Sequence, residues 1–334
     1  MDKEIRVLRS DITNPWFNLA TEDWIFRELD PRQHVLFLWC NADTVVIGRH
    51  QNPWKECKVQ KMEEDQVYLA RRQSGGGAVF HDLGNTNFTF MTSKEQYDQE
   101  ENFRIIIDAL AAFEVSAERS GRNDLLVDGR KISGSAFTHA NDRSFHHGTL
   151  LINADLLRLV DYLSPTKRKL VSKGIESVRS RVANLREYVP DLTHEALTEQ
   201  IFETFCSHYG ETGEVEHLSS SELATIPSLN SYYEQLKDWE WRFGKTPDFS
   251  HHLETRFDWG EIDLHLDVRR GRIKAVRVFS DALNTDMIDY LNDTLQGVPY
   301  DRKHIAGVLR TGANTVPSAE THFSELADWV IKEL

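Results

Sequence analysis

A run of three glycines, Gly75 to Gly77, constrains this chain more than any other feature of its sequence. It stands in the stretch RRQSGGGAVFHDLGN, residues 71–85, between two short apolar runs that predict β-strands. Glycine adopts backbone angles closed to other residues and lets a ligand approach the main chain. Successive N–H groups turned one way bind an anion, and Arg71 and Arg72 would stand at its rim. We therefore predict a phosphate-binding loop, with a glycine-rich hairpin turn and solvated arginines as the alternative.

Composition narrows the classes of partner. The chain has 334 residues, enough for two domains, and its formal net charge of −14 argues against general binding of nucleic acid or anionic membranes. Three widely spaced cysteines, Cys40, Cys57 and Cys206, suggest neither a disulfide framework nor a cysteine zinc site. The N-terminus lacks an apolar run, and none elsewhere approaches the ~18 residues of a membrane span. We expect a cytoplasmic enzyme or binding protein.

A second dense patch follows the glycine loop. The dipeptide Asp128-Gly129 predicts a two-residue hairpin between strands at 125–127 and 130–135, and a third strand is expected at 145–153. We expect these strands and the glycine loop to share one antiparallel sheet. Adjacent strand residues point to opposite faces, so His146 and His147 cannot easily chelate one metal. One of them should face the ligand and the other should pack.

Candidate polar groups lie along these strands. Lys131 has small neighbours that leave room for a carboxylate or phosphate oxygen, although a lone strand lysine is usually solvated. Asn123 and Asp124 could hold Mg²⁺ or could merely cap a turn. His81 follows the glycine loop closely enough to contact the same ligand. The segment 177–184, SVRSRVAN, is either a flap over phosphates or a solvated basic loop.

The residues alone therefore predict a site for an anionic, phosphate-bearing ligand, with one lysine placed for developing charge. The Walker pattern GxxxxGK[ST] is absent. Cys57 has no evident base that would form its thiolate, so a covalent acyl-cysteine route has no support. Beyond a polar, proline-containing stretch near residue 247, alternating residues such as Ile262 and Asp263 predict a half-buried strand in a small α+β accessory domain.

Several ordered motifs together resemble the lipoate–protein ligase A family, of the bacterial two-domain type. They are PWFNLATEDWIF, LFLWCNADTVVIGRHQNPWKEC, RRQSGGGAVFHDLGN, GRNDLLVDGRKISGSAF, FHHGTLL, SVRSRVANL and WEWRFG, with FDWGEIDLHLDV and RVFSDALN in the tail. The resemblance implies an α+β fold: a catalytic domain like those of biotin ligases and class II aminoacyl-tRNA synthetases, with a mixed, mainly antiparallel sheet, plus a small α+β C-terminal domain. The expected boundaries are 1–246 for the catalytic domain, 247–252 for a linker and 253–334 for the accessory domain.

The resemblance also implies a two-step reaction. Lipoate and Mg-ATP would give lipoyl-AMP and pyrophosphate, and the lipoyl group would then pass to a lysine of an acceptor domain. Acceptors would be acyltransferase subunits of 2-oxoacid dehydrogenases and the glycine-cleavage H protein, and the enzyme would be a monomer. The alternatives are an ATP-independent octanoyl or lipoyl transferase of the same fold, working through an acyl-cysteine, and a non-catalytic protein that senses an adenylate.

Site roles follow from the same resemblance. Lys131 matches the family's central catalytic lysine, which touches both the acyl carbonyl and the phosphate, and Asp124 would hold magnesium. The residues expected to contact ATP or the adenylate are Arg72, Gly77, Ala78, Val79, Phe80, Asn123, Asp124, Lys131, Val178, Arg179 and Arg181. Those expected to line the lipoate site are Leu19, Trp39, Ser74, Gly76, His81, Lys131, Ala136 and His147.

Overall fold

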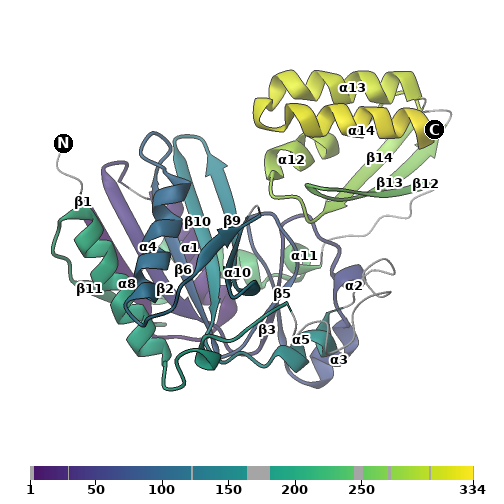
Figure 1. The fold of residues 1–334 in the computed structure, drawn as a ribbon. Coiled ribbons are helices and arrows are strands. Elements are labelled where there is room, and N and C mark those ends of the chain that lie inside the picture. Colours follow the sequence, from purple (N-terminus) through teal and green to yellow (C-terminus); the bar gives the residue numbers. More distant parts are fainter. Residues whose placement is uncertain are drawn as a thin grey trace. The chain divides into compact units, whose positions relative to one another are not determined.

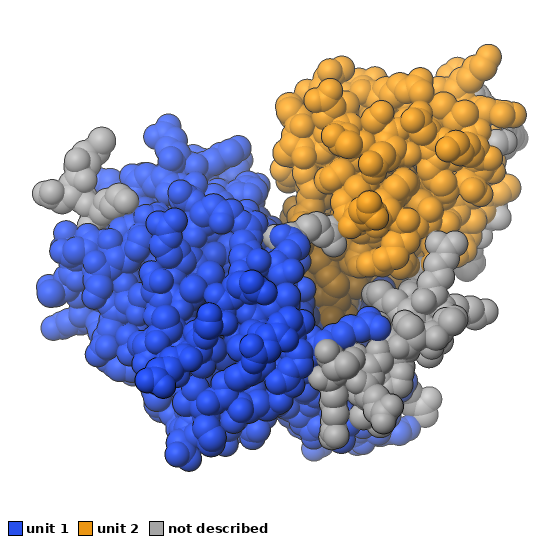
Figure 2. Space-filling model, viewed as in Figure 1, with its two compact units in different colours: residues 1–46, 53–71, 79–242 blue, residues 47–52, 72–78, 243–334 orange. Residues whose placement is uncertain are grey.

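The computed structural model describes residues 4–28, 30–121, 123–163, 181–243, 251–269, 272–300 and 302–333. Its chain divides into two compact units, coloured separately in Figure 2. The first unit comprises residues 1–46, 53–71 and 79–242, and the second comprises residues 47–52, 72–78 and 243–334. The segment that holds the three glycines thus belongs to the second unit, although the strands on either side of it belong to the first.

The main sheet of the first unit has eight strands within the described ranges, in the order β11-β1-β2-β6-β10-β9-β8-β7 (Figure 1). Strand β1 runs parallel to β11 and β2, and the other neighbours pair antiparallel. This confirms the predicted mixed, mainly antiparallel sheet. The strand bounds are β1 (Glu4–Ser10), β2 (Gln33–Cys40), β6 (Asn85–Ser93), β7 (Glu118–Ser120), β8 (Asp124–Val127), β9 (Arg130–Ala140), β10 (Arg143–Leu151) and β11 (Val215–Leu218).

Both faces of this sheet are buried, which explains why the central strand β2 is almost continuously apolar. Leu36 and Leu38 join one hydrophobic cluster with α4 (Gln99–Ala111) and α8 (His194–Tyr209). Phe37 and Trp39 point the other way, into a cluster with α1 (Pro15–Glu28) and α10 (Pro227–Lys237). The other helices in the described part of the unit are α2 (Pro53–Glu56), α3 (Val59–Glu64), α5 (Leu156–Tyr162), η1 (Leu185–Glu187), α9 (Glu222–Thr225) and α11 (Trp239–Arg242).

The glycine segment lies between β4 (Tyr68–Arg71) and β5 (Val79–His81), as predicted. These strands do not extend the large sheet, however; they form a separate small sheet in the order β4-β3-β5, with β3 (Thr44–Ile47) between them. The expectation of one shared sheet is therefore wrong. Because β4 and β5 both pair with β3 and not with each other, residues 72–78 are a crossover, and the hairpin-turn alternative is wrong as well.

The second unit is a three-stranded antiparallel sheet of β12 (His251–Phe257), β13 (Gly260–Arg269) and β14 (Arg272–Ser280). Ile262, Leu264 and Leu266 turn one face into a core shared with the following helices. These helices are α12 (Thr285–Thr294), α13 (Arg302–Thr315), η2 (Pro317–Ala319) and α14 (Glu320–Glu333). The arrangement confirms the predicted α+β class.

Of the expected linker, residues 247–250 lie outside the described ranges, and its last two residues belong to β12. The proposed domain boundaries stay a prediction. Among the described residues, no helix combines the length and apolar character needed to cross a bilayer.

Candidate active site

A tight turn delivers the predicted central lysine to the end of the main sheet. Asp128 and Gly129 have φ angles of 50° and 72°, the left-handed conformation that a two-residue hairpin requires, so the predicted hairpin is confirmed. Lys131 follows on β9, and its Nζ lies 2.7 Å from Oδ1 of Asp124 on β8. Both side chains are about one-third exposed, at 38% and 33%, so their ion pair stabilises the fold by about 1 kcal/mol or less. The pair costs little to open for a ligand.

An irregularity in β9 makes room for this lysine. The pairing of β8 with β9 slips by one residue, leaving Ile132 as an extra residue of β9. A regular strand would place Lys131 and Gly134 on opposite faces, but the bulge lets them share one. A Cβ added to Gly134 would lie 2.8 Å from Nζ of Lys131 and 3.8 Å from Oδ1 of Asp124. Gly134 is therefore the residue whose small size admits the lysine side chain.

The backbone of Lys131 is held by the segment that follows the undescribed residues 164–180. Its N–H donates to the carbonyl of Arg181 at 2.7 Å, and its carbonyl accepts from the N–H of Ala183 at 2.9 Å. Arg181, expected in the adenylate loop, is thus beside the lysine. Val178 and Arg179 lie outside the described residues, and their expected role stays a prediction.

Asn123, which precedes Asp124, is fixed by two hydrogen bonds to one residue of β9. Its side-chain amide donates to the carbonyl of Ser135 at 2.5 Å, and the N–H of Ser135 donates to its carbonyl at 2.8 Å. This anchoring holds the start of β8, and with it the carboxylate that faces the lysine. Asp124 and Lys131 therefore form an ion pair, with Asn123 anchored beside it in the sequence and the backbone of Arg181 bonded to that of Lys131.

A buried carboxylate holds His147. Glu22 on α1 is only 2% exposed, and its two carboxylate oxygens lie 2.9 and 3.0 Å from Nδ1 of His147 on β10. Thr89 on β6 donates its hydroxyl to the same carboxylate at 2.7 Å and accepts from the indole N–H of Trp39 at 3.2 Å. Because Nδ1 faces a carboxylate, the chain Trp39–Thr89–Glu22–His147 fixes both the ring's orientation and its Nδ1–H form.

His81 belongs to the same neighbourhood. Its ring centroid lies 6.1 Å from that of Trp39, and its Nδ1 accepts from the side-chain amide of Asn41 at 3.2 Å. Asn41 is oriented in turn by Asn18, which donates to its amide oxygen at 2.9 Å. Buried amides thus set the tautomer of one histidine, while a buried carboxylate sets that of the other.

Apolar residues predicted as walls of the site lie beside these histidines. Ala136 on β9 pairs directly across from His147 on β10, and its small side chain is 5% exposed. Leu19 and Trp39 belong to one buried cluster, against which Val79 packs. Of the predicted lipoate residues, Ala136 therefore lies beside His147 and Trp39 beside His81, and Leu19 shares a buried cluster with Trp39.

The other residues expected after the glycine loop divide between the two units. Ala78 ends the loop segment of the second unit, whereas Val79 and Phe80 begin β5 in the first. The ring of Phe80 stacks on Tyr162, with centroids 5.5 Å apart. Val79 rather than Phe80 faces the Trp39 cluster.

The three glycines differ in their structural constraints. A Cβ on Gly75 would meet the carbonyl oxygen of Ala282 at 2.2 Å, so this position needs glycine for close approach. Gly76 has a φ of 95°, and its N–H donates to that same carbonyl at 3.2 Å. Gly77 has neither constraint, because a Cβ there would find no atom within 4 Å. The fold itself therefore accounts for Gly75 and Gly76, whereas Gly77 is the glycine whose small size could serve a ligand.

Arg72 closes this loop from within. Its guanidinium donates to the hydroxyl of Ser74 at 3.0 Å and to the carbonyls of Gly75 and Gly77 at 2.7 and 2.9 Å. Both Arg72 and Ser74 are buried. The arginine therefore holds the loop's shape, whatever it also contacts in a complex.

Arg71 does not stand at the rim of an anion site. Its guanidinium donates to the carbonyls of Trp241 and Arg242 at 2.9 and 2.8 Å, which ties β4 to α11. The expectation for this arginine is wrong, because the carbonyl groups at the end of a helix satisfy it.

His146 is the packing member of the histidine pair. Its ring lies among Phe88, Phe103 and Phe137, with centroids 4.7 to 5.5 Å away. Complete burial holds the pKa of this imidazole well below its usual range. Among the described residues, neither ring nitrogen finds a hydrogen-bond partner. The two adjacent histidines thus have the opposite roles expected from strand alternation.

The cysteines are unsuited to covalent catalysis. Burial raises the pKa of Cys40 and of Cys57 to about 12, and it also raises the pKa of Cys206. At neutral pH these groups are thiols, which are poor nucleophiles.

Two residues of the candidate site, Glu22 and Gly134, were not among the site residues predicted from the sequence. Glu22 could have been noticed as a carboxylate in a helix whose residues 17–26 are all buried, because such a group must be paired. The role of Gly134 depends on the bulge at Ile132, which no local pattern announces.

The fold and site define a class: a two-unit α+β enzyme with a lysine–carboxylate pair on its main sheet and a buried pair between a sheet histidine and a helix carboxylate. Comparison with known proteins agrees with this class. Residues 14–206 match the family model described as the lipoyl protein ligase A/B catalytic domain. Residues 246–330 match that of the bacterial lipoate protein ligase C-terminus.

Individual relatives identify the family. The chain is 56% identical to the lipoate-protein ligase A of Psychrobacter cryohalolentis over 99% of both chains. It is 33% identical to P. falciparum LipL1, solved in complex with lipoate, with a TM-score of 0.87 over 98% of this chain and 99% of that one. A lipoate-protein ligase A bound with ATP shares the fold at 23% identity, with a TM-score of 0.61 over 73% and 99%. This chain belongs to the lipoate–protein ligase A family and is an enzyme of the ligase class.

Proposed function

We propose that this enzyme joins lipoate to AMP at the expense of ATP and then transfers the lipoyl group to a lysine of an acceptor protein. The observation that carries the proposal is the position of Lys131, on the same strand as Ala136, which pairs with His147. One strand thus links a cation suited to phosphate with the apolar, histidine-flanked group suited to a fatty acyl chain. Relatives solved with lipoate or with ATP support both substrates.

In the first step the lipoate carboxylate oxygen attacks the α-phosphorus of ATP, and the bond to pyrophosphate breaks. Two anions must approach, so catalysis is chiefly positioning and electrostatic stabilisation. A unit negative charge ~4 Å from the ammonium of Lys131 is stabilised by ~4 kcal/mol at a partly screened site. The ammonium leaves Asp124 for the substrate at small cost, because a partly exposed ion pair stabilises the fold by about 1 kcal/mol or less.

We propose roles for the other expected site residues as well. Glu22 and Thr89 hold His147 against the acyl chain, and Asn41 does the same for His81. On the resemblance, Arg72 and Gly77 of the glycine loop would contact the nucleotide, and Ser74 and Gly76 would line the acyl group. The open space at Gly77 supports the first of these roles. Phe80, Arg179 and Val178 are proposed adenylate contacts on the resemblance alone.

Magnesium fits the polar group around Asp124. One carboxylate beside an amide, completed by substrate phosphates, is a donor set that Mg²⁺ accepts. Because Oδ1 of Asp124 contacts Lys131, the ion would share that carboxylate with the lysine or use its other oxygen. When bound, the ion neutralises phosphate charge.

In the second step the neutral amine of the acceptor lysine attacks the lipoyl carbonyl, and the bond to AMP breaks. Asp124 or a phosphate oxygen is the proposed acceptor of the amine's proton. The proposed acceptors are the lipoyl domains of 2-oxoacid dehydrogenase acyltransferases and the glycine-cleavage H protein, in the cytoplasm. An acyl-cysteine transferase is disfavoured because burial keeps the cysteines protonated.

The test is lipoate-dependent exchange of pyrophosphate into ATP. Lys131→Ala should lower the exchange rate at least ~10²-fold, the scale for loss of one preorganised charge donor. Lys61→Ala is a matched control, because Lys61 pairs with Asp65 at 2.8 Å with similar exposure. Near-normal exchange by Lys131→Ala, or equal losses in both variants, would contradict the role given to Lys131.

A further inference from the structure

A group of side chains that could ligate a metal ion lies on the second unit, and none of the candidate active-site residues belongs to it. It stands on the face of the three-stranded sheet opposite the core: Ile262, Leu264 and Leu266 point into the core, so Asp263 and His265 point to the other face. On the neighbouring strand β12, His252 pairs directly across from His265. Three potential ligands therefore share one face of two adjacent strands.

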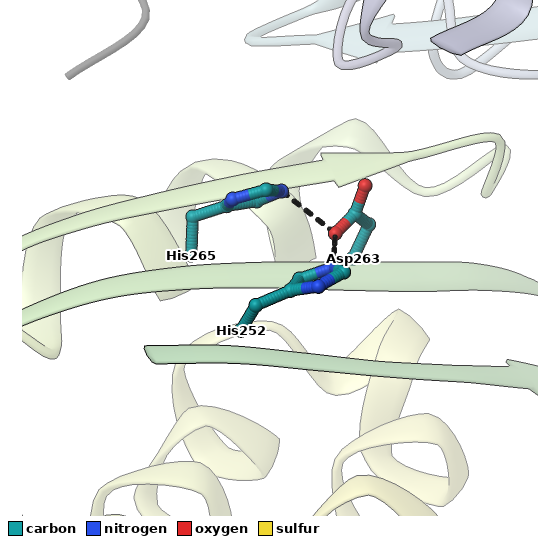
Figure 3. Close-up of side chains that lie close together, drawn as sticks. All are labelled: His252, Asp263 and His265. Atoms are coloured by element: carbon teal, nitrogen blue, oxygen red, sulfur yellow. Dashed lines mark hydrogen bonds and ion pairs between the residues drawn. The ribbon is translucent and has the colours of Figure 1, made fainter. Parts of the chain in front are cut away.

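Their donor atoms converge on one point. Nε2 of His252 lies 2.6 Å from Oδ1 of Asp263, and Nε2 of His265 lies 2.8 Å from the same oxygen. All three ligand atoms lie within 4.8 Å of one another. Figure 3 shows both imidazoles directed at this carboxylate. The rings stack with centroids 4.6 Å apart, so their nitrogens are presented side by side.

The charges of these side chains are better balanced by a bound metal cation than by protonation of both histidines. If both Nε2 atoms donate to Asp263, each ring must be protonated there, and full charging would stack two cations against one carboxylate. Glu254 lies across from Asp263, with an oxygen 3.9 Å from Nε2 of His252. Two carboxylates and two neutral imidazoles balance a divalent cation.

The distances also suit a small metal ion. Zinc binds histidine nitrogen and carboxylate oxygen at about 2.0–2.2 Å, which places tetrahedral ligands ~3.3 Å apart. The observed contacts of 2.6 and 2.8 Å would need to open by well under ~1 Å, within reach of side-chain rotation. Asp263 is buried at 4% exposure, whereas His252 is half exposed and offers an entry path.

We propose that His252, Asp263 and His265, with Glu254 as fourth ligand, bind a divalent transition metal, zinc foremost. Imidazole ligands select zinc, copper or nickel over the harder Mg²⁺ and Ca²⁺. The site is separate from the magnesium proposed at Asp124 and does not depend on the proposed reaction.

The experiment is calorimetric titration of the metal-stripped full chain with Zn²⁺ at pH 7.5, in the presence of millimolar Mg²⁺. We expect one site that His252→Ala weakens at least ~10-fold, as loss of a ligand requires. His251→Ala is the matched control: His251 precedes His252, points to the opposite face and lies against Tyr300. The control should keep wild-type affinity for zinc. Zinc bound elsewhere on the chain would affect both variants equally, so a difference between them reports on the proposed site.

A second readout is Co²⁺ absorption. The wild type and His251→Ala should show the intense visible bands of a tetrahedral ion, and both His252→Ala and Asp263→Asn should lose them. His252 is half exposed, so its variant is expected to fold. Absence of a zinc site in the wild type, or equal affinities for the two histidine variants, would overturn the proposal.

Discussion

The substitution Gly134→Ala tests whether the precise position of the Lys131 ammonium limits adenylation. A Cβ at residue 134 would lie 2.8 Å from Nζ and 3.0 Å from Cε of Lys131, both at the free end of a flexible side chain. Ordinary carbon contacts begin at about 3.5 Å, so the ammonium must move by about 1 Å. A displacement of that size from a reacting group can cost ~10²-fold in rate.

Folding should be nearly unaffected by the same change. Gly134 has no left-handed φ, and the Lys131 side chain that must shift is about one-third exposed, so the free energy of unfolding should change by less than ~1 kcal/mol. Gly307→Ala is the control, because a Cβ on this exposed residue of α13 meets nothing within 4 Å.

The assay is single-turnover formation of lipoyl-AMP, with chemical denaturation run in parallel. We expect a loss of about 10²-fold for Gly134→Ala and wild-type rates for Gly307→Ala. Wild-type adenylation by Gly134→Ala would refute the argument that this glycine places the lysine. A large loss of stability would refute it too, since the substitution would then act through the fold.

Three further substitutions test other parts of the account. Glu22→Ala should lower the free energy of unfolding by about 3 kcal/mol, because it leaves the buried partners of this carboxylate without a hydrogen-bond acceptor. Glu22→Gln should lower it by only about 1 kcal/mol, and equal losses in the two variants would contradict the buried pair. Gly75→Ala should lower the melting temperature of the second unit, and Gly77→Ala should not; a reversed order would contradict the separate roles of the glycines. His146→Leu should stabilise the first unit by about 1–3 kcal/mol at pH 7, and more at pH 5, in urea denaturation.

The sign of the last effect follows from the depressed pKa of His146. Below about pH 6.5 the imidazole takes up a proton in the unfolded chain but not in the folded chain. For this group, the free energy of unfolding therefore decreases by about 1.4 kcal/mol for each unit by which the pH is lowered. In His146→Leu, this contribution to the pH dependence of the free energy of unfolding should disappear. A similar contribution from His194, whose pKa burial also lowers, should remain in both proteins. An unchanged slope would show that His146 does not titrate as described.

Local sequence signals predicted much of this fold because they act over a few residues. The Asp128-Gly129 turn and the opposite fates of His146 and His147 follow from backbone angles and strand alternation. Strand partners are chosen by distant residues instead. Nothing within residues 71–85 indicates that Thr44–Ile47 lies between β4 and β5, so the shared sheet was wrong.

The same limit applies to the site. Lys131 was predicted with small neighbours, but its register and the need for Gly134 depend on a bulge between two strands. Arg71 has the same sequence context as Arg72, yet carbonyls 170 residues away satisfy it. Glu22 gains its meaning only when α1 packs beside β10 and brings it to His147.

The most direct test of the whole account is the intact mass of an apo lipoyl domain after incubation with this enzyme, lipoate, ATP and Mg²⁺. We expect a gain of one lipoyl group per acceptor, abolished when ATP is withheld or the acceptor lysine is replaced. An unmodified acceptor, or the same gain without ATP, would contradict it.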